Sequence, residues 1–116
     1  MSGPFLRLWL PVAAWAGLIF ALSSVPNLGT GLGDWDLVLR KIAHAAEFAV
    51  LGALLLRATD RAGLAFALGA LYAVSDELHQ VFVPGRMGSP LDVGIDTVGV
   101  ACGVLWQCAA RTRRVA

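Results

Sequence analysis

The chain alternates long apolar segments with short polar ones, and this pattern predicts helices that cross a membrane. The longest uncharged segment, 8–33, exceeds the roughly 20 residues that an α-helix needs to span a bilayer. Three further apolar segments are long enough if charged residues are tolerated toward one end. The predicted helices cover residues 8–24, 37–56, 62–83 and 91–110. The expected fold is therefore all-α, an integral membrane bundle of four transmembrane helices in a single domain, 1–116.

Composition supports a membrane protein. The mean hydropathy is +0.72, and only 15% of the residues are charged, against about 25% in ordinary soluble domains. The alternative is a small soluble helical bundle, but its helices would each show a polar face, and segments 62–75 and 97–110 show none. The net charge of +1 indicates no nucleic-acid surface. We expect the lipid bilayer to be the main partner, and the sequence leaves the oligomeric state open.

Basic residues are distributed unevenly between the two sides of the predicted bundle. Three residues fall on one side, Arg40, Lys41 and Arg86. Six fall on the side of both termini and the second loop, namely Arg7, Arg57, Arg61, Arg111, Arg113 and Arg114. The positive-inside rule therefore predicts a multi-pass protein of the cytoplasmic membrane with both termini in the cytoplasm. The first span could instead be a cleaved signal peptide, but its length and the membrane character of the rest favour a retained helix.

Polar residues recur at helical spacing inside the second, third and fourth predicted helices. The steps are three residues in the second helix, three and four in the third, and four in the fourth, so each set lines one helix face. All of them fall in the outer halves of their helices, where they can be sheltered from lipid only by facing one another. The candidate ligand-binding residues are Lys41, His44, Glu47, Asp76, Glu77, His79, Gln80, Asp92 and Asp96 on the helices and Arg86 in the loop above them. The sequence thus predicts an outward-facing polar pocket.

The charges of this pocket do not balance. The acidic residues are five, namely Glu47, Asp76, Glu77, Asp92 and Asp96, and the basic residues on the same side are three, namely Arg40, Lys41 and Arg86. Each charge left unpaired near the bilayer centre costs about 2.5 to 3.5 kcal/mol. Protonation, a cationic histidine, a bound cation or exposure to water could each remove the excess. An ion-paired network that only holds three helices together is the structural alternative, although burying so many charges stabilises a bundle less than apolar packing does.

A divalent metal ion is one candidate cofactor. His44, Glu47, Asp76 and His79 offer mixed nitrogen and oxygen ligands at spacings that suit Zn²⁺ or another divalent ion. The sequence contains neither HExxH nor a cysteine ligand set, and no GxSxG motif indicates a serine hydrolase. A membrane-embedded, metal-dependent enzyme acting on a lipid-linked or phosphate-bearing substrate is therefore one of the open interpretations.

Small residues recur every four positions in the first and fourth predicted helices. Ala13, Gly17 and Ala21 form one row, and Gly99 with Gly103 forms the other. Such rows let helix backbones approach closely in lipid. We expect contacts within the bundle rather than dimerisation.

Five motifs follow one another along the chain: FALSSVP at 20–26, KxxHxxEF at 41–48, DExHQ at 76–80, PGR at 84–86 and DxxxDxxG at 92–99. In this order they resemble the VanZ-like membrane proteins over nearly the whole chain. That family is named for a component linked to glycopeptide resistance, especially to teicoplanin, which implies action at the outer membrane face. This agrees with the outward-facing polar pocket predicted from the residues, so we expect that pocket to bind or modify a cell-envelope ligand such as a lipid-linked precursor. A structural or partner protein without ligand is the remaining alternative.

Overall fold

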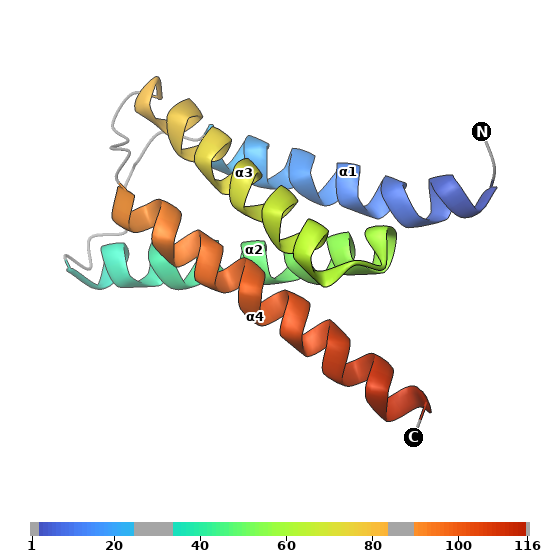
Figure 1. The fold of residues 1–116 in the computed structure, drawn as a ribbon. Helices are drawn as coiled ribbons and strands as arrows, with labels where there is room; N and C mark the ends of the chain where they lie inside the picture. Colours follow the sequence, from blue (N-terminus) through green and yellow to red (C-terminus); the bar gives the residue numbers. More distant parts are fainter. Residues whose placement is uncertain (1–2, 25–33, 84–89, 116) are drawn as a thin grey trace.

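The computed structural model describes residues 3–24, 34–83 and 90–115. In this part of the chain there are four helices and no strand (Figure 1). The helices are α1 (Gly3–Ser23), α2 (Asp34–Thr59), α3 (Ala62–Val81) and α4 (Pro90–Val115). Their number and order confirm the predicted all-α fold.

Helices α1, α2 and α4 extend beyond the apolar segments that predicted them, whereas α3 begins at the predicted residue and ends at Val81, two residues before its predicted end. Helix α1 begins at Gly3, five residues before the expected start, and Pro4 suits its first turn because a first-turn residue needs no helical N–H partner. Helix α4 begins at Pro90 for the same reason. The apolar pattern marks the part of each helix that avoids water, whereas the helical hydrogen bonds continue through the polar flanks.

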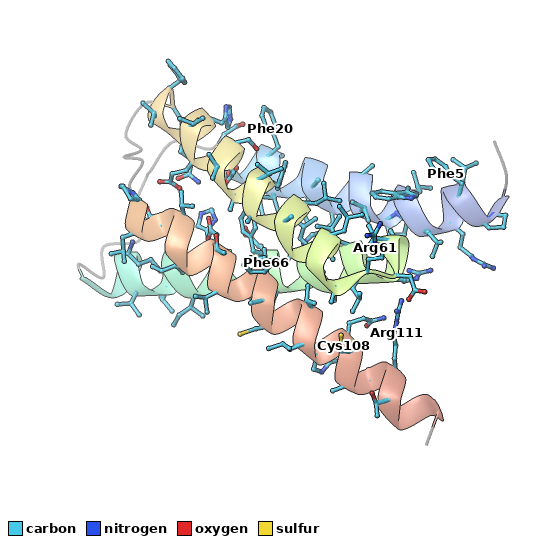
Figure 2. The ribbon with its side chains drawn as sticks, in the orientation of Figure 1. Phe5, Phe20, Arg61, Phe66, Cys108 and Arg111 are labelled. Atoms are coloured by element: carbon cyan, nitrogen blue, oxygen red, sulfur yellow. The ribbon has the colours of Figure 1, made fainter. Side chains whose placement is uncertain are left out.

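A tight turn joins α2 to α3 and is closed by α4. Asp60 takes a left-handed conformation with a φ of 57°, and its N–H bonds the carbonyl of Leu56 at 2.8 Å. Arg111 of α4 forms an ion pair with Asp60 and donates to the same carbonyl at 3.3 Å. Figure 2 labels Arg61 in this turn and Arg111 on α4. Helix α4 thus satisfies the free carbonyl end of α2.

Helices α2 and α4 make the closest backbone contact in the bundle. A Cβ atom on Gly99 would overlap the carbonyl group of Ala45, and one on Gly103 would overlap that of Ala49. The predicted contact of these glycines within the bundle is therefore confirmed. Gly17 of α1 differs, because among the described residues nothing lies within 4 Å of an added Cβ.

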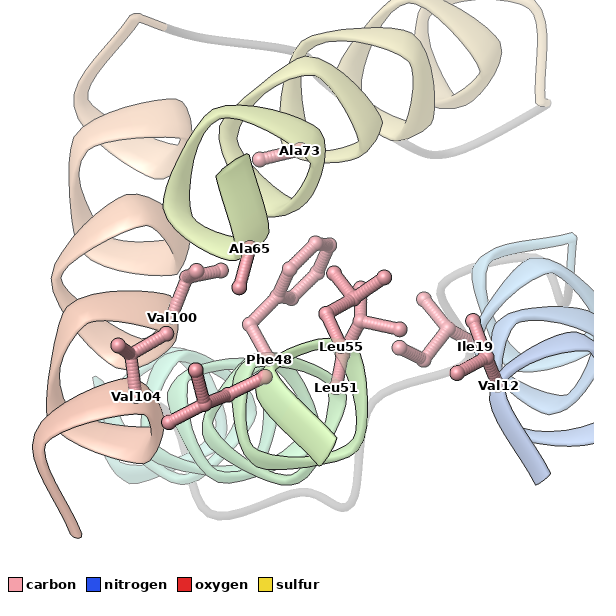
Figure 3. Close-up of a cluster of buried hydrophobic side chains, with 10 residues drawn as sticks. Val12, Ile19, Phe48, Leu51, Leu55, Ala65, Ala73, Val100 and Val104 are labelled. Carbon is pink, nitrogen blue, oxygen red and sulfur yellow. The ribbon is translucent and has the colours of Figure 1, made fainter. Parts of the chain in front are cut away.

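The hydrophobic core surrounds α2. Figure 3 shows Phe48, Leu51 and Leu55 of α2 pointing between Ile19 of α1 and Val100 of α4. Small side chains of α3 complete the core, namely Ala65 and Ala73. Helix α2 therefore contacts each of the other three helices and fixes their arrangement.

Side-chain hydrogen bonds attach α1 to the bundle. Trp15 Nε1 donates to the backbone carbonyl of Glu47 at 2.8 Å, and the Tyr72 hydroxyl of α3 donates to the carbonyl of Ala16. Both donors use a polar tip on an otherwise apolar side chain.

The outer surface of the bundle is apolar. Large hydrophobic side chains on all four helices are exposed, including Leu10, Leu39, Leu71, Phe82 and Leu105. Gly3–Ser23, Val38–Thr59 and Pro90–Thr112 are long and apolar enough to cross a membrane. An apolar exterior over these lengths is unfavourable in water and suits lipid. The fold is that of a multi-pass membrane protein.

Candidate functional site

The polar residues of α2, α3 and α4 lie toward one end of the bundle, which we call the connector end. It contains the last turns of α1 and α3 and the first turns of α2 and α4, and the two chain termini lie at the opposite, terminal end (Figure 1). At 1.5 Å per residue, His44, Asp76 and Asp96 lie about 15, 7.5 and 9 Å from the connector-end limits of their helices. They therefore lie within the helices rather than on the connections.

Three of these residues converge from three helices. His44 of α2, Asp76 of α3 and Asp96 of α4 each offer a ligand atom, and these atoms all lie within 4.8 Å of one another. We call them the polar triad. Asp76 and Asp96 are each only 2% exposed. Among the described residues, neither Asp76 Oδ1 nor Asp96 Oδ1 has a hydrogen-bond partner.

Two further residues orient the triad. Gln80 Nε2 donates to Asp76 Oδ2 at 3.0 Å from one helical turn away, and this fixes the plane of the carboxylate. Glu47 Oε2 lies 3.5 Å from His44 Nδ1, close enough to bias the orientation of the imidazole. Glu77 is also buried and adds another carboxylate to α3.

The edge of the site carries an ion pair. Lys41 of α2 and Asp92 of α4 are in direct contact and both are partly exposed. Asp92 therefore neutralises the positive charge of Lys41. Asp92 and Asp96 lie one turn apart, which places this pair nearer the connector end than the triad.

His79 faces α1 and not the triad. Its Nε2 lies 2.8 Å from Ser24 Oγ, and its ring stacks on Phe20 with centroids 4.2 Å apart. The Ser24 hydroxyl donates its single proton to the carbonyl of Phe20 at 2.8 Å. His79 Nε2 must therefore donate to Ser24, and this nitrogen carries a proton.

The structure thus distributes the candidate residues among three places. His44, Asp76 and Asp96 converge, with Gln80 and Glu47 beside them. Lys41 and Asp92 form the edge of the site, and His79 joins α3 to α1. Arg86 lies outside the described residues. Sequence reasoning did not identify Ser24 as the partner of His79. The signal for it was the pair of serines that ends an otherwise apolar helix.

A family model described as VanZ/LLP1 matches residues 5–111, which is nearly the whole chain. Searches of curated proteins and of solved structures gave no match.

Proposed function

The chain belongs to the VanZ/LLP1 family, and from this premise we propose that it binds or modifies a cell-envelope ligand at the outer face of the cytoplasmic membrane. The observation that carries the proposal is the polar triad. It is enclosed at one end of a bundle whose exterior is apolar, with two carboxylate oxygens that no described residue satisfies. A ligand that enters from the connector end would meet these groups.

A purely structural role explains the triad less well. A polar network that only joins helices stabilises the fold most when every buried polar atom has a hydrogen-bond partner, because each unsatisfied atom costs about 1 to 3 kcal/mol of stability. Apolar side chains at positions 76 and 96 would pack three helices without that cost. The two carboxylates are therefore better accounted for by something that they bind.

The outward orientation is supported by charge. Arg7, Arg57, Arg61 and Arg111 belong to the terminal end, which the positive-inside rule assigns to the cytoplasm. The connector end then opens outside the cell. Helix α3 completes the fourth crossing in this proposal, since Leu71 and Leu78 expose a lipid-facing stripe on it.

The ligand class that we propose is a lipid-linked, phosphate-bearing envelope precursor. Such a molecule can approach a site inside the outer leaflet from the bilayer itself. The link of the family name to glycopeptide resistance supports the same side of the membrane, since glycopeptides act outside the cell.

A second candidate function is metal-dependent catalysis on such a ligand. It is favoured by the convergence of one imidazole and two carboxylates, a donor set that a divalent cation can use. A bound cation would polarise a phosphoryl oxygen or activate water, and Glu77 or Glu47 would then be the candidate general base.

Expression in a teicoplanin-susceptible bacterium tests the proposal. We compare the unaltered chain with Asp76→Asn and His44→Gln, and with Asp60→Asn at the terminal end as the matched control. We expect the unaltered chain and the control to raise the inhibitory concentration of teicoplanin, and the two site variants to lose the effect at equal abundance in the membrane. Site variants that protect as well as the unaltered chain would contradict a role for the site.

A binding measurement tests the ligand directly. Purified protein in detergent is mixed with a polyisoprenyl phosphate, and the complex is detected by native mass spectrometry with phosphatidylcholine as the control lipid. We expect selective binding that Asp76→Asn weakens at least tenfold. Equal binding of both lipids would contradict the proposed ligand class.

A further inference from the structure

We propose that His44, Asp76 and Asp96 form a binding site for one divalent cation of the Zn²⁺ or Mn²⁺ class. The inference deepens the proposed function and rests on it only for the cation's role, which is to present an open position to the phosphate of the ligand. The metal site itself stands on the geometry and burial of the three residues.

Charge supports a divalent ion. Two ionised carboxylates and a neutral imidazole carry a charge of −2, which one divalent cation cancels. Each of the two aspartates is 98% buried, and each keeps one oxygen without a hydrogen-bond partner in the described part of the chain. A cation between them would satisfy both oxygens at once.

The spacing of the ligand atoms also suits a cation. Around an ion held at about 2.0 to 2.2 Å, ligand atoms lie roughly 3 to 4 Å apart. The triad atoms already lie within 4.8 Å of one another, so small side-chain rotations are enough to bring them to the spacing of metal ligands. Because the ligands come from α2, α3 and α4, the ion would join three helices.

The residues around the triad resemble the outer shell of known metal sites. Ligating carboxylates and histidines are usually held by a second polar group, which fixes the orientation of the ligand. Gln80 holds Asp76 through Oδ2, which leaves Oδ1 for the ion. Glu47 lies beside the His44 ring at 3.5 Å from Nδ1.

The donor types select the class of ion. Nitrogen and carboxylate oxygen donors suit Zn²⁺ and Mn²⁺, whereas Ca²⁺ prefers six to eight oxygens. Three protein ligands leave at least one coordination position open, as in catalytic sites. His79 does not join the set, because its Nε2 donates to Ser24 on the α1 side.

Metal analysis of the purified chain in detergent tests the inference. The protein is stripped with a chelator, equilibrated with Zn²⁺ or Mn²⁺, desalted and analysed by mass spectrometry of the metal, and affinities are measured by calorimetry. We expect one equivalent in the unaltered chain and at least a hundredfold loss of affinity in Asp76→Asn and in Asp96→Asn. The matched controls His79→Gln and Asp60→Asn should keep the affinity within a few fold. Absence of stoichiometric metal in the unaltered chain, or aspartate variants that bind the metal as tightly as the unaltered chain, would overturn the site.

Thermal unfolding gives an independent readout. Without metal, Asp96→Asn should unfold at the same temperature as the unaltered chain or at a higher one, because it removes a buried carboxyl group with an oxygen that has no partner among the described residues. Added Zn²⁺ should raise the unfolding temperature of the unaltered chain and leave that of the variant unchanged. A metal-free Asp96→Asn variant that unfolds at a clearly lower temperature would indicate an internal structural network instead.

The two proposals fail separately. If no metal binds but Asp76→Asn still abolishes binding of polyisoprenyl phosphate, only the cation site is wrong. If one metal equivalent binds but the chain neither changes teicoplanin susceptibility nor binds that lipid, the cation site stands and the proposed function is wrong.

Discussion

Gln80 Nε2 donates a hydrogen bond to Asp76 Oδ2 across 3.0 Å, from one helical turn further along α3. Both side chains are at least 95% buried. The amide fixes the carboxylate plane and satisfies one of its oxygens, so that Asp76 Oδ1 is the oxygen left facing the interior of the bundle.

Replacing Gln80 by methionine should therefore weaken metal binding without abolishing it. Loss of an orienting group typically costs 10- to 100-fold in metal affinity, and the carboxylate oxygen left unsatisfied costs about 1 to 3 kcal/mol of stability. Calorimetry with Zn²⁺ and thermal unfolding in detergent measure the two effects. Gln107→Met on α4 is the control, since Gln107 is also buried but lies toward the terminal end. An unchanged affinity in Gln80→Met would show that the amide does not position Asp76.

The sequence predicted the fold well because the apolar segments are long. Four segments of this length admit only a helical solution in lipid, where each backbone group must find its partner within the segment. The ends were less predictable, since α1 begins at Gly3 and α4 continues to Val115 through polar residues that water can solvate. Among the described helices, α1, α2 and α4 contain segments long and apolar enough to cross a membrane, and a crossing by α3 stays a prediction.

The sequence could place the polar residues on helix faces but could not predict which neighbouring helix each side chain contacts. From Asp76, a step of three residues rotates by about −60° around the helix axis and a step of four by about +40°. His79 and Gln80 therefore lie about 100° apart, on opposite edges of one polar stripe. Only the packing of α3 decides that His79 faces Ser24 while Gln80 stays with Asp76.

The rows of small residues show the same limit. Both rows have the spacing that permits close helix contact. In the structure Gly103 lies against the backbone of Ala49, whereas Ala13, Gly17 and Ala21 are all exposed. The difference lies in where the neighbouring helices pack, which the spacing alone does not specify.

Substituting alanine for Gly103 should destabilise the bundle by about 1 to 3 kcal/mol, because the added methyl would have to displace the backbone of α2. The matched control is Gly17→Ala, where nothing within the described part of the chain lies near the added methyl. We expect this control to be neutral or slightly stabilising, since alanine is the better helix former. Unfolding in detergent by heat or by denaturant measures both. Equal stability of the two variants would contradict the close α2 and α4 contact.

Both termini should lie in the cytoplasm. The terminal end carries the larger number of basic residues, and the cytoplasmic side retains positive loops. A green fluorescent protein fused after Ala116 should be fluorescent, and alkaline phosphatase fused there should be inactive. Phosphatase inserted within residues 29–33 should be active. An active phosphatase after Ala116 would put the polar triad on the cytoplasmic side and remove the basis of the envelope proposal.

Replacing Ser24 by alanine should loosen α1 from α3 while leaving the metal site intact. Ser24 Oγ accepts a hydrogen bond from His79 Nε2 and so joins the ends of the two helices, and the Phe20 ring stacks over the same histidine. Loss of one such hydrogen bond costs about 0.5 to 1.5 kcal/mol. The measurement is thermal unfolding of the metal-free protein, with Ser75→Ala as the control, because the exposed hydroxyl of Ser75 bonds only a carbonyl within its own helix.

The same variant separates the two histidines. If His44 belongs to the cation site and His79 to the α1 contact, Ser24→Ala lowers stability and keeps the Zn²⁺ affinity within a few fold, whereas His44→Gln lowers the affinity by at least tenfold. A Ser24→Ala variant that loses Zn²⁺ affinity as strongly as His44→Gln would mean that both histidines serve one site. The metal set would then include His79, and α1 would belong to the site through Ser24.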